Sequence, residues 1–234
     1  MSPAQIAAAN AALRDRTPRK IIGWALAQAP GRALVSTNFR PYEAVILHLA
    51  VQAQPDIPVL WVDHGYNRPA TYRHAEQLRA RLKLNLKPYL PRLSAAHRDA
   101  IHGPIPDTSD EEGLKQFSAR MKLEPFQRGM RELDPRVWIT ALRKVQNPDR
   151  AGLDVVTHDA NFGTLKVSPL FHWSDAELEH YLAEYQLPNE WDYFDPAKAD
   201  EKRECGLHAP WGGRFATAPA EMGDQSSQIE NSAL

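Results

Sequence analysis

Hydrophobic and polar residues alternate along the chain in blocks that predict strands followed by helices. Two apolar runs that end in polar residues, Ala33–Phe39 and Ile57–Tyr66, are typical of strands buried on both faces of a parallel sheet. Each precedes apolar residues at helical spacing, in Tyr42–Gln52 and Pro69–Leu84. We expect Pro41 at the first position of the former helix. Such units in series favour right-handed crossovers and a parallel sheet.

The rest of the chain continues this pattern. We predict two helices within residues 1–28, and Ser94–Asp110 is polar and rich in turn residues. A strand, a helix, a strand, a hairpin and a capped helix are expected at Asn85–Pro91, Glu111–Leu133, Arg136–Gln146, Leu153–Leu170 and Ser174–Leu187. The prediction is an α/β fold, with a mostly parallel central sheet and helices on both faces.

Composition narrows the class of protein. The 234 residues include 28 basic and 29 acidic ones, so no global field favours nucleic acid or an anionic membrane. No apolar run approaches the roughly 20 residues of a membrane span, and the first residues lack the order of a signal peptide. We therefore expect a cytoplasmic protein. The single cysteine excludes an internal disulfide and a site built from cysteines alone, and we expect no metal.

Three polar segments follow predicted strands, where open parallel sheets bind ligands. The loop Ser36–Pro41 offers hydroxyls, backbone N–H groups, a helix dipole and Arg40 to an anion. Asp63–Pro69 contains a glycine and an arginine. Leu142–Arg150 contains three basic residues, and the guanidinium groups and positive charges of such residues suit phosphate or sulfate. Taken singly, the first segment is better explained as an ordinary capped loop. The second and third are explained equally well as a surface turn and a solvated basic loop.

The only cysteine, Cys205, lies in a charged segment. Lys202, Arg203 and His208 favour its thiolate, which is the reactive form, while Glu204 opposes it modestly. Many cysteines are simply buried and inert. Here the neighbours are charged, include a glycine and show no apolar periodicity, which favours a reactive thiol. His208 is interpreted as a base or an anion contact, and an exposed histidine is an equal alternative.

Five motifs of the sequence together resemble those of one protein family. The most specific is "KRECGLH" at 202–208, and the others are "IPVLWVDHGYNRPATY" at 57–72, "RLKLNLKPY" at 81–89, "KLEPFQRGMREL" at 122–133 and "LKVSPLFHWSD" at 165–175. Together they resemble the phosphoadenylyl-sulfate (PAPS) reductase family, which has the adenine nucleotide α-hydrolase-like fold. The resemblance covers about residues 20–208.

The resemblance implies a mechanism and a set of site residues. A cysteine thiolate takes the sulfonate from the nucleotide, and thioredoxin or glutaredoxin then releases sulfite, so one cysteine suffices. Adenosine 3′,5′-bisphosphate is the other product, and the family suggests a homodimer. The implied catalytic residues are Cys205, His208, Lys202 and Arg203. The implied substrate-binding residues are Ser36, Thr37, Asn38, Phe39, Arg40, Asp63, Gly65, Arg68, Arg143, Lys144, Gln146 and Arg150.

The same resemblance divides the chain into three parts. Residues 1–187 are expected to form a nucleotide-binding α/β domain that includes the N-terminal helices. Residues 188–211 are expected to form a mobile segment that carries the catalytic cysteine. Residues 212–234, rich in Gly, Ala, Ser and Gln, are expected to be a disordered tail.

The sequence also departs from the family pattern. Arg40 stands where glycine is usual, and Asn38 replaces a serine. Asn189–His208 lacks the segment with Gly-Asp and threonines that helps hold the substrate, which leaves PAPS and adenylyl sulfate both open. The cysteines that bind an iron–sulfur cluster in adenylyl-sulfate reductases are missing, so no cluster is expected.

Two other functions are weighed. A nucleotide-binding or regulatory relative without turnover would explain Arg40 and the missing segment, but not the intact cysteine motif. An ATP pyrophosphatase-like enzyme that adenylates its substrate would need a Ser-Gly-Gly-rich loop, which this sequence lacks, and would give Cys205 no role.

Overall fold

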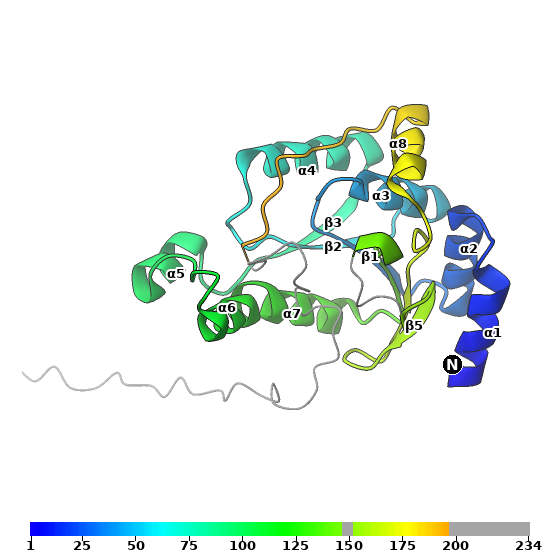
Figure 1. Cartoon of the computed structure of the whole chain (residues 1–234), viewed down its shortest axis with the longest axis horizontal. Coiled ribbons are helices and arrows are strands. Elements are labelled where there is room, and N and C mark those ends of the chain that lie inside the picture. Colours follow the sequence, from blue (N-terminus) through cyan, green and yellow to red (C-terminus); the bar gives the residue numbers. More distant parts are fainter. Residues whose placement is uncertain (147–151, 197–234) are drawn as a thin grey trace, which may run out of the picture.

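The computed structural model describes residues 1–146 and 152–196, which form an α/β fold around a six-stranded sheet (Figure 1). The strand order is β3-β2-β1-β4-β6-β5. The strands are β1 (Ala33–Thr37), β2 (Pro58–Val62), β3 (Asn85–Tyr89), β4 (Val137–Ile139), β5 (Val156–Asp159) and β6 (Thr164–Val167). The helices are α1 (Pro3–Leu13), α2 (Pro18–Gln28), α3 (Glu43–Ala53), α4 (Pro69–Leu82), α5 (Ala95–His102), α6 (Glu111–Ser118), α7 (Glu124–Leu133) and α8 (Asp175–Glu184).

The sheet is parallel apart from one strand at its edge. β1 pairs in parallel with β2 on one side and with β4 on the other, and β2 pairs in parallel with β3. The predicted hairpin is confirmed, because β5 is antiparallel to β6. The chain thus winds outward from β1 to β3 and then returns to β4 on the opposite side of β1. Open α/β sheets bind ligands at such a switch point, beyond the carboxyl ends of the strands.

Helices cover both faces of the sheet, as predicted. In Figure 1, α3, α4 and α8 lie on one side of the strands and α6 and α7 on the other. The alternation of β1 explains this, because Val35 belongs to the larger core with α2, α3, α4 and α8. Leu34 belongs to the smaller core beneath α7. Among the helices that the structure describes, none has the length and apolar character needed to cross a bilayer.

Several boundaries differ from the prediction. Pro41 is not at the first helical position: Glu43 begins α3, and Tyr42 before it has φ 72. The polar, turn-rich stretch Ser94–Asp110 contains α5, whose N-cap Ser94 accepts a hydrogen bond from the backbone N–H of His97. The predicted strand Arg136–Gln146 is only three residues long, and a 3₁₀ turn occupies Lys144–Gln146. Here the backbone leaves the sheet to reach the site.

The predicted helix Glu111–Leu133 is helical but not uniform. A π-helical stretch, Ala119–Leu123, joins α6 to α7. A π turn holds more residues than an α turn and therefore redirects the side chains on it, and such turns are frequent at functional sites. This stretch buries both Met121 and Lys122.

Candidate functional site

The loop between β1 and α3 takes a compact and strained path. Two of its residues that are not glycine, Phe39 and Tyr42, have left-handed φ values of 54 and 72. Side chains other than glycine rarely adopt this conformation, and such strain often marks functional sites. Phe39 is fully buried and packs edge-on against Trp61 of β2, with ring centroids 5.1 Å apart. The packing of this ring against the sheet helps hold the loop in its conformation.

Glu43 at the start of α3 organises the loop from inside. Its Oε2 accepts hydrogen bonds from the Thr37 hydroxyl at 2.8 Å and from the Asn38 backbone N–H at 2.7 Å. The side chain is buried, and a carboxylate is stabilised at a helix N-terminus by the helix dipole. The Phe39 N–H donates to the Thr37 hydroxyl at 3.0 Å. These loop donors, which we expected to bind a ligand anion, are therefore used within the protein.

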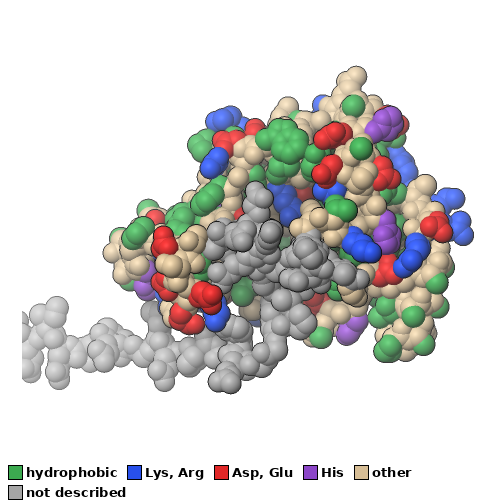
Figure 2. Space-filling model, viewed as in Figure 1, with side chains coloured by type: hydrophobic (Ala, Val, Ile, Leu, Met, Phe, Trp, Pro, Cys, Tyr) green, Lys and Arg blue, Asp and Glu red, His purple; other side chains and the backbone are tan. Residues whose placement is uncertain are grey.

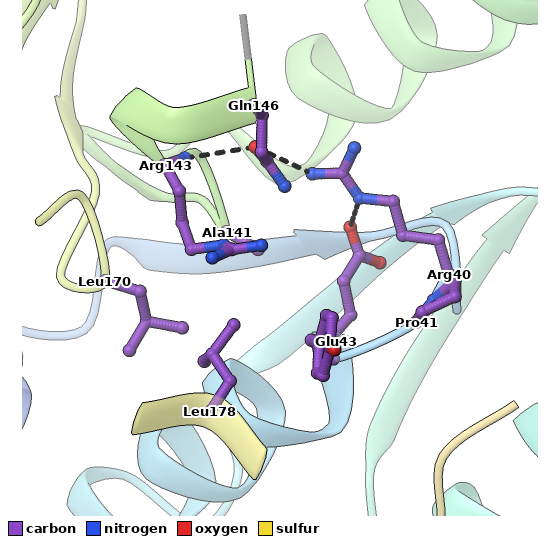
Figure 3. Close-up of a pocket in the computed structure, with 9 residues that line it drawn as sticks. Arg40, Pro41, Glu43, Ala141, Arg143, Gln146, Leu170 and Leu178 are labelled. Atoms are coloured by element: carbon purple, nitrogen blue, oxygen red, sulfur yellow. Dashed lines mark hydrogen bonds and ion pairs between the residues drawn. The ribbon is translucent and has the colours of Figure 1, made fainter. Parts of the chain in front are cut away.

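Arg40 extends from this loop across the switch point. Its Nε donates to Glu43 Oε1 at 2.9 Å, and its Nη2 lies 3.4 Å from Oε1 of Gln146. The same oxygen of Gln146 accepts from the backbone N–H of Arg143 at 3.1 Å. Figure 3 shows the Gln146 side chain between the two arginines. The loops after β1 and β4 thus meet through one amide oxygen.

A pocket lies beside this contact. It is lined by Arg40, Pro41, Tyr42, Glu43, Ala141, Arg143, Gln146, Leu170 and Leu178. Two guanidinium groups, the Gln146 amide and the Glu43 carboxylate form its polar part, and two leucines form its apolar side (Figure 3). Guanidinium forks match phosphate and sulfate oxygens, so the pocket suits a ligand with both an anionic and an apolar part.

Arg143 is held rigidly in this pocket. Its Nη2 pairs with Asp175 at 2.6 Å, and its Nη1 donates to the carbonyl of Trp173 at 3.2 Å. The guanidinium lies 5.6 Å from the ring centre of Tyr42. Burial raises the pKa of Tyr42 to about 12, aided by the hydrogen bond that its hydroxyl donates to Glu179. The hydrogen bond to Glu179 and the contact with Arg143 orient the Tyr42 ring at the edge of the pocket.

The loop after β2 is built around Asp63. One carboxylate oxygen, Oδ1, accepts from the Gly65 N–H at 3.0 Å, the Asn67 amide at 3.1 Å and the Tyr72 hydroxyl at 2.7 Å. Gly65 has φ 80, and a Cβ there would approach Cβ of Ala95 to 3.1 Å. Asp63 and Gly65 therefore shape the turn, and the structure shows a structural use for both.

The remaining predicted residues are spread more widely. Ser36 points to the α7 face, where its hydroxyl accepts a hydrogen bond from the Trp138 indole at 2.8 Å. Arg68 pairs with Asp192, and Lys144 is exposed on the 3₁₀ turn. Of the predicted substrate-binding residues, the pocket thus brings together Arg40, Arg143 and Gln146.

Part of the prediction lies outside the described residues. These positions are Arg150, Lys202, Arg203, Cys205 and His208. Within 1–146 and 152–196, no cluster of three or more His, Cys, Asp or Glu side chains is arranged to hold a metal ion.

Sequence reasoning missed three charged residues at this edge of the sheet: Glu43, Lys122 and Asp195. Glu43 carried a usable signal, because acidic residues are favoured in the first turn of a helix. Lys122 and Asp195 form a buried ion pair across 73 positions of the chain. Nothing local in the sequence indicates that pair, because the π-helical turn that buries Lys122 breaks the periodicity from which burial is inferred.

Comparisons with known proteins agree with this architecture. Residues 32–191 match the family model described as the phosphoadenosine phosphosulfate reductase domain. Phosphoadenosine 5′-phosphosulfate reductases from Synechococcus sp. and Synechocystis sp. are 33% and 36% identical to the chain. The alignments cover 85% of this chain in both cases, with 95% of the first relative and 88% of the second.

Solved structures lead to the same family. The phosphate complex of PAPS reductase from Candida auris superposes with a TM-score of 0.70 and 25% identity, over 81% of this chain and 89% of that one. An FMN adenylyltransferase from Candida glabrata, 17% identical, reaches a TM-score of 0.54 over 74% of this chain and 55% of its own, which shows a shared fold alone. The chain belongs to the phosphoadenosine phosphosulfate reductase domain family.

Proposed function

We propose that this protein reduces PAPS to sulfite and adenosine 3′,5′-bisphosphate, with thioredoxin or glutaredoxin as the electron donor. The observation that carries the proposal is the family match, which spans the whole sheet and both loops of the pocket. The paired arginines at the switch point support it, because the substrate is a nucleotide with several anionic groups.

The chemistry uses one thiol of this chain. The Cys205 thiolate attacks the sulfonate sulfur, the bond from that sulfur to the bridging phosphate oxygen breaks, and the nucleotide leaves with the electron pair. A thiolate of the reductant then attacks the Cys205 sulfur and expels sulfite. Its second thiol resolves the mixed disulfide, so the dithiol is oxidised by two electrons and the sulfonate sulfur is reduced by two. Because Cys205 must stay reduced, we infer a cytoplasmic enzyme.

The pocket suggests where the anion of the substrate binds. The N–H groups of Asn38 and Phe39 already donate within the loop, and Glu43 places a negative charge behind them. Arg40 through its guanidinium and Arg143 through its backbone N–H instead meet at Oε1 of Gln146, so a phosphate or sulfate oxygen can take the place of that amide oxygen. The Arg143 side chain lines the same pocket, and its guanidinium pairs with Asp175. We therefore assign anion binding to Arg40 and Arg143 at this pocket rather than to the backbone of the β1–α3 loop. The homodimer stays a prediction.

A turnover assay tests the proposal. The purified protein is mixed with thioredoxin, its recycling reductase and either PAPS or adenylyl sulfate, and sulfite release is followed. We expect sulfite from PAPS, and none from Cys205→Ser, which removes the nucleophile but alters one atom. Sulfite from adenylyl sulfate alone would change the assigned substrate. Nucleotide binding without sulfite from either substrate would contradict the proposal and favour a relative without turnover.

A further inference from the structure

The segment 189–196, here called the strap, crosses the carboxyl edge of the sheet after α8. Figure 1 shows it leaving α8, passing α4 and turning toward the strand ends near α6. Its first residue, Asn189, accepts a hydrogen bond from the Tyr42 backbone N–H at 2.8 Å. Farther along, the carbonyl of Asp192 accepts from the hydroxyl of Thr71 on α4 at 3.3 Å. The strap therefore spans the loops that follow both β1 and β2.

The strap ends in a buried ion pair. Nζ of Lys122 lies 2.7 Å from each carboxylate oxygen of Asp195, and the two side chains are 3% and 5% exposed. The π-helical stretch before α7 turns Lys122 inward to this position. A buried ammonium group is costly without an anionic partner, so Lys122 strongly favours the conformation in which Asp195 is close.

The neighbouring His64 supplies no charge that could replace that of Asp195. Burial, aided by the charge of Lys122, lowers the pKa of His64 to about 4. Its Nδ1 accepts the Tyr66 N–H at 3.1 Å, which requires an unprotonated nitrogen. His64 is therefore neutral at pH 7 and supplies no charge to Lys122, whereas Asp195 supplies a full one.

The other contacts of the strap are more exposed. Asp192 pairs with Arg68, but about half of each side chain is open to solvent. Trp191 meets the Tyr42 ring edge-on at 5.2 Å and is 64% exposed. Exposed pairs of this kind contribute little, because water and salt screen them. Of these two ion pairs, Lys122–Asp195 is the buried one, and we therefore treat it as the main anchor of the strap in the proposal below.

We propose that the Lys122–Asp195 pair positions the cysteine-bearing end of the chain over the site. Cys205 follows Asp195 by 10 residues, but it follows Glu184, the last residue of α8, by 21. Local concentration falls as about the −3/2 power of tether length, so release of the whole strap on loss of this anchor lowers that of Cys205 at the site by up to about threefold. Lys122 and Asp195 are positioning residues, and this inference rests on the proposed role of Cys205.

Hydrogen exchange and alkylation test the proposal on the full chain. Hydrogen–deuterium exchange reports whether strap residues 189–196 stay bound. The second readout is how far adenosine 3′,5′-bisphosphate slows the alkylation of Cys205 by iodoacetamide, which requires no turnover. We expect Asp195→Asn to speed strap exchange at least about tenfold, because the buried lysine loses its partner. Protection of Cys205 by the nucleotide should fall by up to about threefold.

Two further variants separate positioning from other effects. Asp192→Asn makes the same chemical change in the same strap at an exposed pair, and we expect exchange and protection close to wild type. The double variant Lys122→Met, Asp195→Leu replaces the ion pair by apolar side chains, a change that buried pairs often tolerate. We expect it to restore slow exchange and protection, which also guards against a mere folding defect in Asp195→Asn.

Three results would overturn the proposal. The strap of Asp195→Asn could exchange as slowly as in the wild-type protein. It could exchange fast while the nucleotide still protects Cys205 fully, or the double variant could be as defective as Asp195→Asn. The proposed function fails separately. If the wild-type protein releases no sulfite while the strap variants behave as expected, then the anchor holds and the assigned reaction is wrong.

Discussion

Glu43 decides which donors of the β1–α3 loop are open to a ligand. Its carboxylate accepts hydrogen bonds from Thr37, Asn38 and Arg40 and lies behind the pocket. From the sequence, this loop resembled an anion-binding helix N-terminus. In the structure the helix dipole already has an internal anion, and the anion site that we propose lies at Arg40 and Arg143 instead. The Arg40 that replaces an expected glycine is thereby given a fixed orientation.

Glu43→Gln tests this role. A glutamine must turn its NH₂ group toward a donor, so at least one buried hydrogen bond is lost. We expect the free energy of unfolding in urea to fall by about 1–3 kcal/mol. Glu76→Gln is the matched control, because Glu76 pairs with Arg79 on the surface of α4 and both side chains are more than half exposed. That change should stay within about 0.5 kcal/mol. Equal losses would contradict the organising role of Glu43.

His64 makes stability depend on pH. Its folded-state pKa is about 4, below the usual value of about 6.5, so the unfolded chain takes up the proton first as the pH falls. The stabilisation of the folded state that comes from burying neutral His64 is therefore present above about pH 6.5 and is lost progressively as the pH falls to about 4. Between pH 7 and 5 this linkage removes about 2 kcal/mol.

His64→Asn isolates that contribution. The Asn side-chain oxygen can still accept the Tyr66 N–H, but it does not titrate. We expect the drop in unfolding free energy from pH 7 to pH 5 to be about 2 kcal/mol smaller in this variant than in the wild-type protein. The same pH dependence in both proteins would show that His64 is not buried in its neutral form.

At the scale of elements, the order of strands and helices was predictable and their ends were not. Continuous apolar runs gave β1 and β2, and the capping box of Ser174 and Glu177 gave the start of α8. Pro41 misled because the chain first makes the left-handed turn at Tyr42. That conformation is stabilised by tertiary contacts of the ring, which no local pattern records.

The packing of α7 on the sheet gives a prediction at this scale. Gly129 lies so close to the strands that a Cβ would approach Cδ1 of Leu60 to 2.6 Å and the Tyr89 ring to 3.0 Å. We expect Gly129→Ala to reduce the unfolding free energy by about 1–3 kcal/mol, although alanine favours a helix. In Gly23→Ala nothing lies within 4 Å of the new atom, so this helix should gain up to about 1 kcal/mol. A stabilising Gly129→Ala would refute this close packing.

At the scale of the molecule, the site is assembled from segments distant in sequence. The rule for parallel sheets predicted which strand ends meet, and it correctly joined Arg40 to Arg143 and Gln146. It could not predict that Ser36 faces α7 or that Asp63 is used within its own turn, because both depend on particular side-chain hydrogen bonds. The division into domain, cysteine segment and tail stays a prediction.

The distribution of charge over the whole molecule favours a local anion-binding site rather than long-range electrostatic attraction of the ligand. Figure 2 shows acidic and basic side chains interspersed over the face that it presents, in keeping with the net charge of −1. Under the proposed function, attraction of an anionic nucleotide then depends on a few fixed arginines, and the reaction itself on one thiol.

The central claim is that Cys205 accepts the sulfonate of the substrate. The most direct measurement is the intact mass of the protein after incubation with PAPS in the absence of any thiol reductant. The account predicts a covalent gain of one sulfonate group in the wild-type protein, none in Cys205→Ser, and loss of the added mass on addition of thioredoxin. An unchanged mass with both PAPS and adenylyl sulfate, or the same adduct in Cys205→Ser, would contradict it.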